Sequence, residues 1–387
     1  MKRTRRLAFL FGLSAILCAP ANASNSQPTQ LFAFSCTDNR FQDCPQGLEP
    51  QALLQASDGN FYGATSRGGS QNLGTIFRVT PSGKFTPLFS FSGTNGSSPG
   101  QTMVEAADGN LYGTTEFGGE FSTGVVFKIA KNGSGFRIVH SFEKKFAVEF
   151  FFGEYLTLGG DGNIYGSSVG GGLNVAVCQY GCGTIFRINI PSGQFLTIHQ
   201  LNGISEGSEP SALIQASDGN FYGTAGTNLF RVSSTGKFTV VGSLSALGIP
   251  YPGGGGVIQA SNGNLFGMMD NVNQALLFEI ALDGSGLQAF PEISALQNSI
   301  TLSKLLQTAD GNLWLAQAAI LGQNGAIMSL SSRSGLLLQN IPFNLADGSG
   351  PMAPLVQGVD GNLYGTTLFG GTPSSGTGAG VVFRFTP

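Results

Sequence analysis

The stretch that decides the fold is ASDGNFYG, residues 56–63, because close copies of it recur along the whole chain. Seven copies are found when they are aligned on the Asp or Asn that precedes the first Gly. These reference residues are Asp58, Asp108, Asp161, Asp218, Asn262, Asp310 and Asp360. A self-similar unit of about 50 residues has the length of a four-stranded propeller blade. The spacing therefore predicts seven structural units rather than one catalytic motif.

Each unit reads as four short strands. In the first unit, strands a to d are predicted at QALLQAS (51–57), FYGATS (61–66), GTIFRVT (74–80) and KFTPLFSFS (84–92). Asp-Gly between apolar runs is a strong hairpin signal, because Gly59 takes the positive φ of a tight turn. The strands are apolar on both faces, as expected of sheets packed between neighbouring sheets. Residues 292–307 are the exception and are interpreted as a loop that enters strand a, with one helical turn.

The two ends of the chain complete each other. The seventh unit stops at Pro387, where its strand d should begin, while QLFAFSC (30–36) matches strand d of the first unit without any strand a, b or c before it. Such an arrangement closes a ring and leaves no sheet edge at the closure. The prediction is an all-β fold over residues 24–387: a seven-bladed β-propeller of four-stranded blades, closed by an N-terminal strand that completes the last blade.

The N-terminus indicates export. Residues 1–23 have four basic residues, then an apolar run, then Ala21-Asn22-Ala23, which is the pattern of a signal peptide cleaved after Ala23. No later stretch reaches the roughly 20 apolar residues of a membrane span. A secreted or periplasmic, monomeric protein is expected. The formal net charge of -3 argues against nucleic acid as a partner, because nucleic-acid binding requires a basic face.

Four cysteines follow the signal segment, and an even number in an exported protein favours disulfides. The simplest pairing is local, Cys36 with Cys44 and Cys178 with Cys182. A metal site built from all four thiolates is the alternative, but the spacing matches no familiar zinc module. We therefore expect two disulfides, no metal site and no cofactor.

The unit DGNLYGTTEFGGEFSTGVVFKI, residues 108–129, resembles the GloVer tandem repeat of exported bacterial proteins. The resemblance covers essentially all seven units and implies a propeller-like surface or secreted protein, with no established activity to transfer. Members often carry a C-terminal anchor, and none follows Pro387, so release is expected. The layout also resembles kelch repeats but lacks their strand-d Trp, and DGNLW (310–314) is similar to streptogramin lyases without their His and Glu pattern.

A binding function is predicted on the face that carries the longer loops. The b-to-c loops of units 1, 2, 3 and 7 are long and contain paired glycines, and they form one continuous arc in a closed ring. Loops on a rigid scaffold are where recognition is usually built. A carbohydrate, peptide or protein ligand is expected there, at Arg67, Glu116, Phe117, Glu120, Phe121, Tyr180 and Phe369. The alternative is that the aromatic residues only pin the loops down.

Signals for catalysis are weak, and no catalytic residue is predicted. His140 and His199 stand where the first unit has Phe89, so they are interpreted as packing or surface residues. Paired acids such as Glu116 and Glu120 can perform glycosidase chemistry. The alternative function is therefore a lyase or hydrolase that acts on an extracellular polymer such as a polysaccharide. The loop at 143–155, with its four phenylalanines, is interpreted as an apolar patch or as a plug over the ring.

Overall fold

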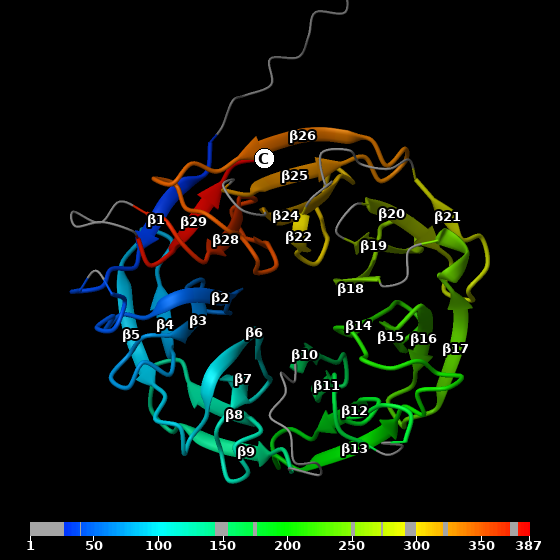
Figure 1. Cartoon of the computed structure of the whole chain (residues 1–387), viewed down its shortest axis with the longest axis horizontal. Helices are drawn as coiled ribbons and strands as arrows, with labels where there is room; N and C mark the ends of the chain where they lie inside the picture. The colour runs from blue at the N-terminus through cyan, green and yellow to red at the C-terminus, as the bar shows by residue number, and fades with distance from the viewer. Residues whose placement is uncertain are drawn as a thin grey trace, which may run out of the picture.

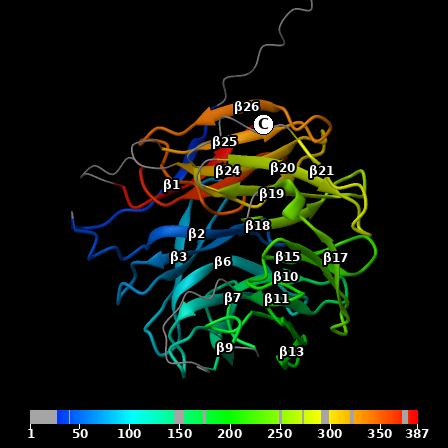
Figure 2. The same ribbon diagram turned by 45° about the vertical axis from the view of Figure 1, so that its right-hand side comes forward.

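The computed structural model describes residues 27–38, 40–143, 154–172, 176–248, 252–271, 274–290, 299–319, 324–371 and 378–387. The predicted signal peptide, residues 1–23, lies outside the described residues, and so do the phenylalanines of the loop at 144–153. Seven antiparallel sheets stand around a common axis in a closed ring, as Figure 1 shows face-on and Figure 2 shows obliquely. The predicted seven-bladed β-propeller is confirmed.

The blades follow the order of the chain, and each is described from its inner to its outer strand. Blade 1 consists of β2 (Leu48–Gln55), β3 (Phe61–Arg67), β4 (Thr75–Val79) and β5 (Phe85–Ser90). Blade 2 consists of β6 (Ser97–Glu105), β7 (Asn110–Phe117), β8 (Val125–Ala130) and β9 (Arg137–Ser141). Blade 3 consists of β10 (Glu154–Leu158), β11 (Ile164–Ser168), β12 (Thr184–Ile188) and β13 (Phe195–Gln200).

Blades 4 to 6 repeat this plan, with a short helical turn, η1 (Ser245–Leu247), after blade 4. Blade 4 consists of β14 (Ile214–Gln215), β15 (Phe221–Ala225), β16 (Asn228–Val232) and β17 (Phe238–Ser243). Blade 5 consists of β18 (Pro252–Gln259), β19 (Leu265–Asn271), β20 (Gln274–Ile280) and β21 (Gln288–Ala289). Blade 6 consists of β22 (Ser299–Leu302), β23 (Leu306–Gln307), β24 (Leu313–Ala319), β25 (Ala326–Leu330) and β26 (Leu337–Pro342). The predicted loop over residues 292–307 leads into the strand β23, which pairs with β24, but the prediction was wrong at β22, which also pairs with β24.

Blade 7 joins the two ends of the chain. Its strands β27 (Val356–Gln357), β28 (Leu363–Thr367) and β29 (Val381–Phe385) come from the C-terminus, and β1 (Thr29–Ala33) is its outer strand. β1 runs antiparallel to β29, with Gln30 opposite Phe383 and Ala33 opposite Val381. The predicted closure by an N-terminal strand is confirmed.

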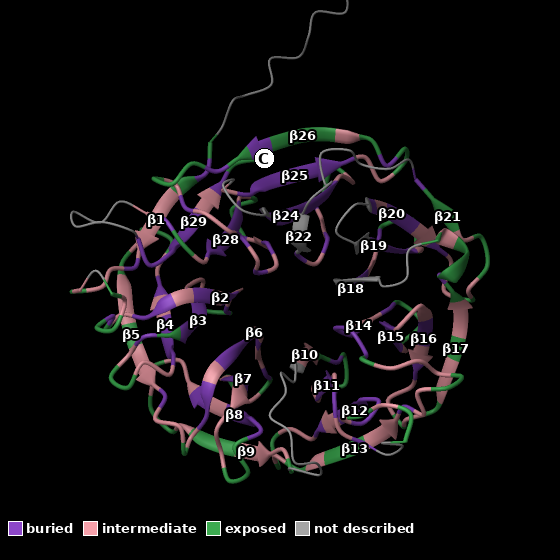
Figure 3. Ribbon diagram, viewed as in Figure 1, coloured by how far each residue is buried: buried purple, intermediate pink, exposed green. Residues whose placement is uncertain are grey.

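The hydrophobic core is divided among the seams between neighbouring blades. The cluster at the seam between blades 1 and 2, called seam 1–2, contains Ile76 and Phe91 from blade 1 and Val125 and Phe127 from blade 2. Each of the other six clusters likewise draws on two adjacent blades. Figure 3 shows the result: β25 is buried along its length, while the outer strand β26 is largely exposed.

The DGN turns are structural clips. In blade 1 the Tyr62 hydroxyl donates to Asp58 at 2.8 Å, and Asn60 donates its side-chain amide to the same carboxylate at 3.0 Å. Blades 2, 3, 4 and 7 repeat both bonds. Burial alone would raise the pKa of Asp58, but these hydrogen bonds outweigh it and hold the pKa below its usual value. Gly59 has the predicted positive φ, +78°.

A second clip joins neighbouring blades on the same face. The Gln or Glu that ends the inner strand accepts a hydrogen bond from a backbone N–H of the preceding blade. This bond is formed by Ser57 with Glu105, Gly160 with Gln215, Ser217 with Gln259, Ser261 with Gln307 and Val359 with Gln55. At seam 2–3 the corresponding residue is Leu158, which has no acceptor and is 42% exposed.

Candidate functional site

The loops gather on the face opposite the clips. Each DGN turn and each turn between the third and fourth strands lies at one end of its blade, so the two longer connections of every blade lie at the other end. The connection between the second and third strands runs from Ser168 to Thr184 in blade 3 but only from Ala225 to Asn228 in blade 4. The long loops of blades 7, 1, 2 and 3 are therefore neighbours in the ring (Figure 1).

The paired glycines explain how three of these loops are held. Their second glycine donates its backbone N–H to the chain segment that enters the blade: Gly69 to Cys44 at 2.9 Å, Gly119 to Gly93 at 3.0 Å and Gly371 to Leu345 at 2.9 Å. The first glycine lies against the same segment. A Cβ on Gly118 would come within 2.3 Å of the Gly93 carbonyl oxygen, so no other residue fits there.

Blade 3 departs from this arrangement. Its matching first glycine is Gly171, whose φ of +81° is close to the +82° of Gly118. Nothing among the described residues lies within 4 Å of where its Cβ would stand. The residue before the pair is Gly170, where blades 1, 2 and 7 carry Arg67, Phe117 and Phe369. The segment that enters blade 3, residues 144–153, lies outside the described residues, and among the described residues neither a docked segment nor the side chain of the repeat stands at this place.

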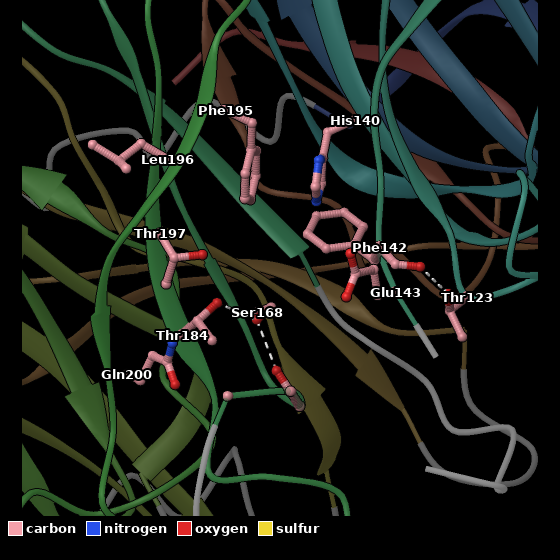
Figure 4. Close-up of a pocket in the computed structure, with 13 residues that line it drawn as sticks. Thr123, His140, Phe142, Glu143, Ser168, Thr184, Phe195, Leu196, Thr197 and Gln200 are labelled. Atoms are coloured by element: carbon pink, nitrogen blue, oxygen red, sulfur yellow. Dashed lines mark hydrogen bonds between the residues drawn. The ribbon is translucent and has the colours of Figure 1, made fainter. Parts of the chain in front are cut away.

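A cavity of about 400 Å³ lies here, along seam 2–3 (Figure 4). Such a volume falls in the range of small-molecule sites. Blade 2 supplies one wall and blade 3 the other. The glycine loop of blade 3 and the outer strands of both blades contribute lining residues. The lining residues of this seam pocket are Thr123, His140, Phe142, Glu143, Ser168, Gly170, Gly171, Gly172, Thr184, Phe195, Leu196, Thr197 and Gln200.

The pocket wall is polar where the neighbouring seam is apolar. Strand register places Thr184 and Thr197 in blade 3 where blade 2 has Val125 and Ile138. Thr123 replaces Leu73, the residue before the glycine that precedes the third strand, and Leu73 packs into the cluster of seam 1–2. Three apolar side chains of seam 1–2 are therefore replaced by threonines at seam 2–3.

His140 packs as predicted and also reaches the pocket. Its ring stacks on Phe195 with centroids 3.6 Å apart, just as Phe89 stacks on Phe136 at 4.0 Å one seam earlier. His199 stacks on Phe238 in the same way, at 4.2 Å. Burial lowers the pKa of His140, and Glu143 opposes this shift only in part. The imidazole is therefore neutral at pH 7, and Glu143 is the one charged side chain among the described lining residues.

The seven residues predicted for ligand binding do not meet in this pocket; none of them lines it. Arg67 pairs with Glu49 at 3.3 Å, and Glu116 accepts a hydrogen bond from Ser98 at 3.1 Å while burial raises its pKa. Glu120, Phe121 and Phe369 are exposed, whereas Phe117 and Tyr180 are half-buried. The Gly170 substitution in the repeat was the sequence signal that would have directed attention to seam 2–3.

Both predicted disulfides are present, Cys36–Cys44 and Cys178–Cys182, so the thiolate metal site is overturned. They fix loops on the same face as the pocket. Cys178–Cys182 packs on Gly203 in the segment that enters blade 4, where any Cβ would collide with both sulfurs. Disulfides are typical of proteins outside the cytoplasm. Across the described residues there is no cluster of three or more acidic, His or Cys side chains that would suit a metal ion.

No helix within the described ranges has the length and apolarity needed to cross a membrane. This agrees with the strand-only architecture, in which η1 is a single short turn.

Comparison with known protein families identifies the family of this chain. The profile of the Gloeobacter/Verrucomicrobia repeat matches residues 24–228, just over half of the chain. The chain belongs to the Gloeobacter/Verrucomicrobia repeat family. This confirms the resemblance seen in the repeat units. No match is found among curated protein sequences.

Solved structures share the fold of this Gloeobacter/Verrucomicrobia repeat protein at low identity. The extracellular domain of a hybrid two-component system from B. thetaiotaomicron aligns with a TM-score of 0.59 at 13% identity, over 94% of this chain and 41% of that one. A fungal alcohol oxidase of the AA5 family aligns at 0.53 and 12%, over 89% and 74%. The present chain thus spans 41% of that extracellular-domain chain, and such identities show the fold alone.

Proposed function

We propose that this protein is an exported, non-enzymatic binding protein that takes its ligand on the loop-bearing face, in the seam pocket between blades 2 and 3. The observation that carries the proposal is the interruption of the repeat at that seam. A pocket at the seam of two blades in a closed ring offers a concave site on a rigid frame, which is where ligands usually bind.

The chemistry of the pocket favours binding over hydrolysis. Glycoside hydrolysis commonly uses two carboxyl groups that flank the scissile bond. The described lining of the seam pocket contains one carboxylate, Glu143. Glu116, one of the two acids considered for such chemistry, is half-buried against Ser98, and neither it nor Glu120 lines the pocket.

The location outside the cytoplasm rests on the two disulfides and on the signal-like N-terminus. Expression of the full chain in a bacterial host, followed by fractionation, tests export. We expect the mature protein outside the cytoplasm, beginning after Ala23, with both disulfides formed. A chain that retains its N-terminus and stays reduced in the cytoplasm would refute this part of the proposal.

The binding proposal is tested by screening the purified mature chain against a panel of oligosaccharides and peptides, with the Gly170→Phe variant beside it. Phe stands at this position in blades 2 and 7, so the substitution restores the repeat and should fold normally. We expect it to fill the pocket and abolish binding. Phe121→Ser is the matched control on the exposed arc. If binding is lost in the control and kept in Gly170→Phe, the ligand occupies the arc and the proposed site is wrong.

A further inference from the structure

One polar atom in the seam pocket has no partner. The side-chain carbonyl oxygen of Gln200 is buried and accepts no hydrogen bond from any described residue. A buried acceptor without a donor costs roughly 1–3 kcal/mol, so such atoms are usually satisfied by something bound. Gln200 lines the pocket, and its counterpart at seam 1–2 is the smaller Ser141. A water molecule or a ligand with a hydrogen-bond donor would satisfy it.

The rest of the wall can both donate and accept. Thr184 and Thr197 bring hydroxyl groups, and Figure 4 shows them on the same side of the pocket as Gln200. Ser168 and Thr184 are hydrogen-bonded to each other at 2.8 Å, which fixes the position of both. Phe142 stands opposite, beside Glu143. An aromatic face across from several hydroxyl groups suits a ring that has polar edges and an apolar face.

Charge narrows the ligand further. Glu143 is the only ionised group in the described lining, and neither Lys nor Arg lines the pocket. A carboxylate or phosphate group would bring a second negative charge next to Glu143, and that group itself could not donate to Gln200. An anionic group in the pocket is therefore disfavoured next to Glu143.

We propose that the seam pocket binds a neutral sugar residue, one hydroxyl group of which donates to the side-chain oxygen of Gln200. This inference rests on the proposed function and specifies the ligand class at the same site. A sugar ring supplies several hydroxyl groups that donate and accept at once, which matches the polar wall, and its C–H face matches Phe142.

The first test uses calorimetric titration of the mature chain with neutral malto-, cello-, xylo- and manno-oligosaccharides, oligogalacturonate, chitosan oligosaccharides and a peptide library. We expect at least one neutral series to bind, and oligogalacturonate to bind at least tenfold more weakly. Glu143→Gln should narrow that gap by strengthening uronate binding. Pocket-dependent binding of uronate, chitosan oligosaccharide or peptide, with no neutral sugar bound, overturns the sugar assignment and leaves the proposed function standing. Absence of any pocket-dependent binding overturns both.

The second test separates binding from folding. Gln200→Met removes the unpaired oxygen at similar volume, so the unfolding midpoint should stay the same or rise, while neutral-sugar affinity falls about tenfold. Thr184→Val should also weaken binding, and Thr75→Val is its matched control, since Thr75 makes the same 2.8 Å bond with Thr65 in blade 1. A Gln200→Met variant that is destabilised yet binds normally would assign the residue a purely structural role and overturn the proposal.

Discussion

Seams 1–2 and 2–3 are built from the same repeat, and three contacts of seam 1–2 have no equivalent among the described residues of seam 2–3. At seam 1–2, Gly118 lies against the backbone of the entering segment, Leu73 packs into the shared cluster, and Glu105 accepts the backbone N–H of Ser57 at 2.6 Å. At seam 2–3, the corresponding residues are Gly171, Thr123 and Leu158, and the described residues supply none of these contacts. The comparison teaches that the repeat builds the ring, and that a site arises where repeat residues are replaced.

The largest expected difference is the cost of adding a methyl group to the matched glycines. Gly118→Ala should destabilise the protein by about 3 kcal/mol or more, because a positive φ and a backbone collision add together. Gly171→Ala, with nearly the same φ and no described neighbour, should cost about 1 kcal/mol. Denaturant unfolding of both variants measures the difference. Equal costs would show that seam 2–3 is packed as tightly as seam 1–2.

The two disulfides provide the next comparison. Each closes a short loop, with sequence separations of 8 and 4, and each should contribute about 2 kcal/mol on the loop-entropy scale. Their effects on binding should differ. The Cys178–Cys182 loop accepts the Gly171 N–H through Tyr180 at 2.8 Å, at the rim of the pocket.

We therefore expect the double variant Cys178→Ser, Cys182→Ser to lose both stability and affinity. The variant Cys36→Ser, Cys44→Ser should lose stability alone. Calorimetric unfolding and ligand titration of both variants decide the matter, and a similar loss of affinity in the two would argue against a pocket at seam 2–3.

A smaller effect is expected on the clip face. Leu158→Gln restores the residue type, Gln or Glu, that clips five other seams and should raise the free energy of unfolding by about 1 kcal/mol. Gln215→Leu, which removes the 2.6 Å bond from Gly160, should lower it by a similar amount. If Leu158→Gln gives no gain, the two seams differ in more than this side chain.

The smallest effect is on the pH dependence of stability. Burial alone would raise the pKa of Glu105, but Lys131 and Ser57 outweigh it, so the folded pKa lies below the unfolded value of about 4.3. The stabilisation is therefore complete above that value and is lost as the pH falls through the folded pKa. When the unfolding midpoint is measured as a function of pH, Glu105→Gln should reduce the fall of the midpoint at acid pH. Leu158→Gln should leave that fall unchanged. An unaltered fall in Glu105→Gln would contradict the clip.

The sequence predicts the fold because each repeat unit contains the same turn-forming residues. Asp58, Gly59 and Tyr62 reappear as one clip in blade after blade, and the missing strand at the C-terminus matches the extra strand at the N-terminus. The site was harder to predict. Exposed Phe121 and Phe369 drew attention to loop tips, whereas the pocket depends on which side chains are missing between two blades. Gly170 is such a residue, and its meaning appears only when the entering segment of its neighbours is located in space.

The most direct measurement is hydrogen–deuterium exchange of the wild-type chain with and without the tightest neutral oligosaccharide of the titration panel. We predict slower exchange in residues 168–172 and 196–200, which line the seam pocket, and no change in residues 65–69, their counterparts in blade 1. Protection confined to the loops around Phe121 and Phe369, with none at seam 2–3, would contradict the central claim that the ligand binds where the repeat is interrupted.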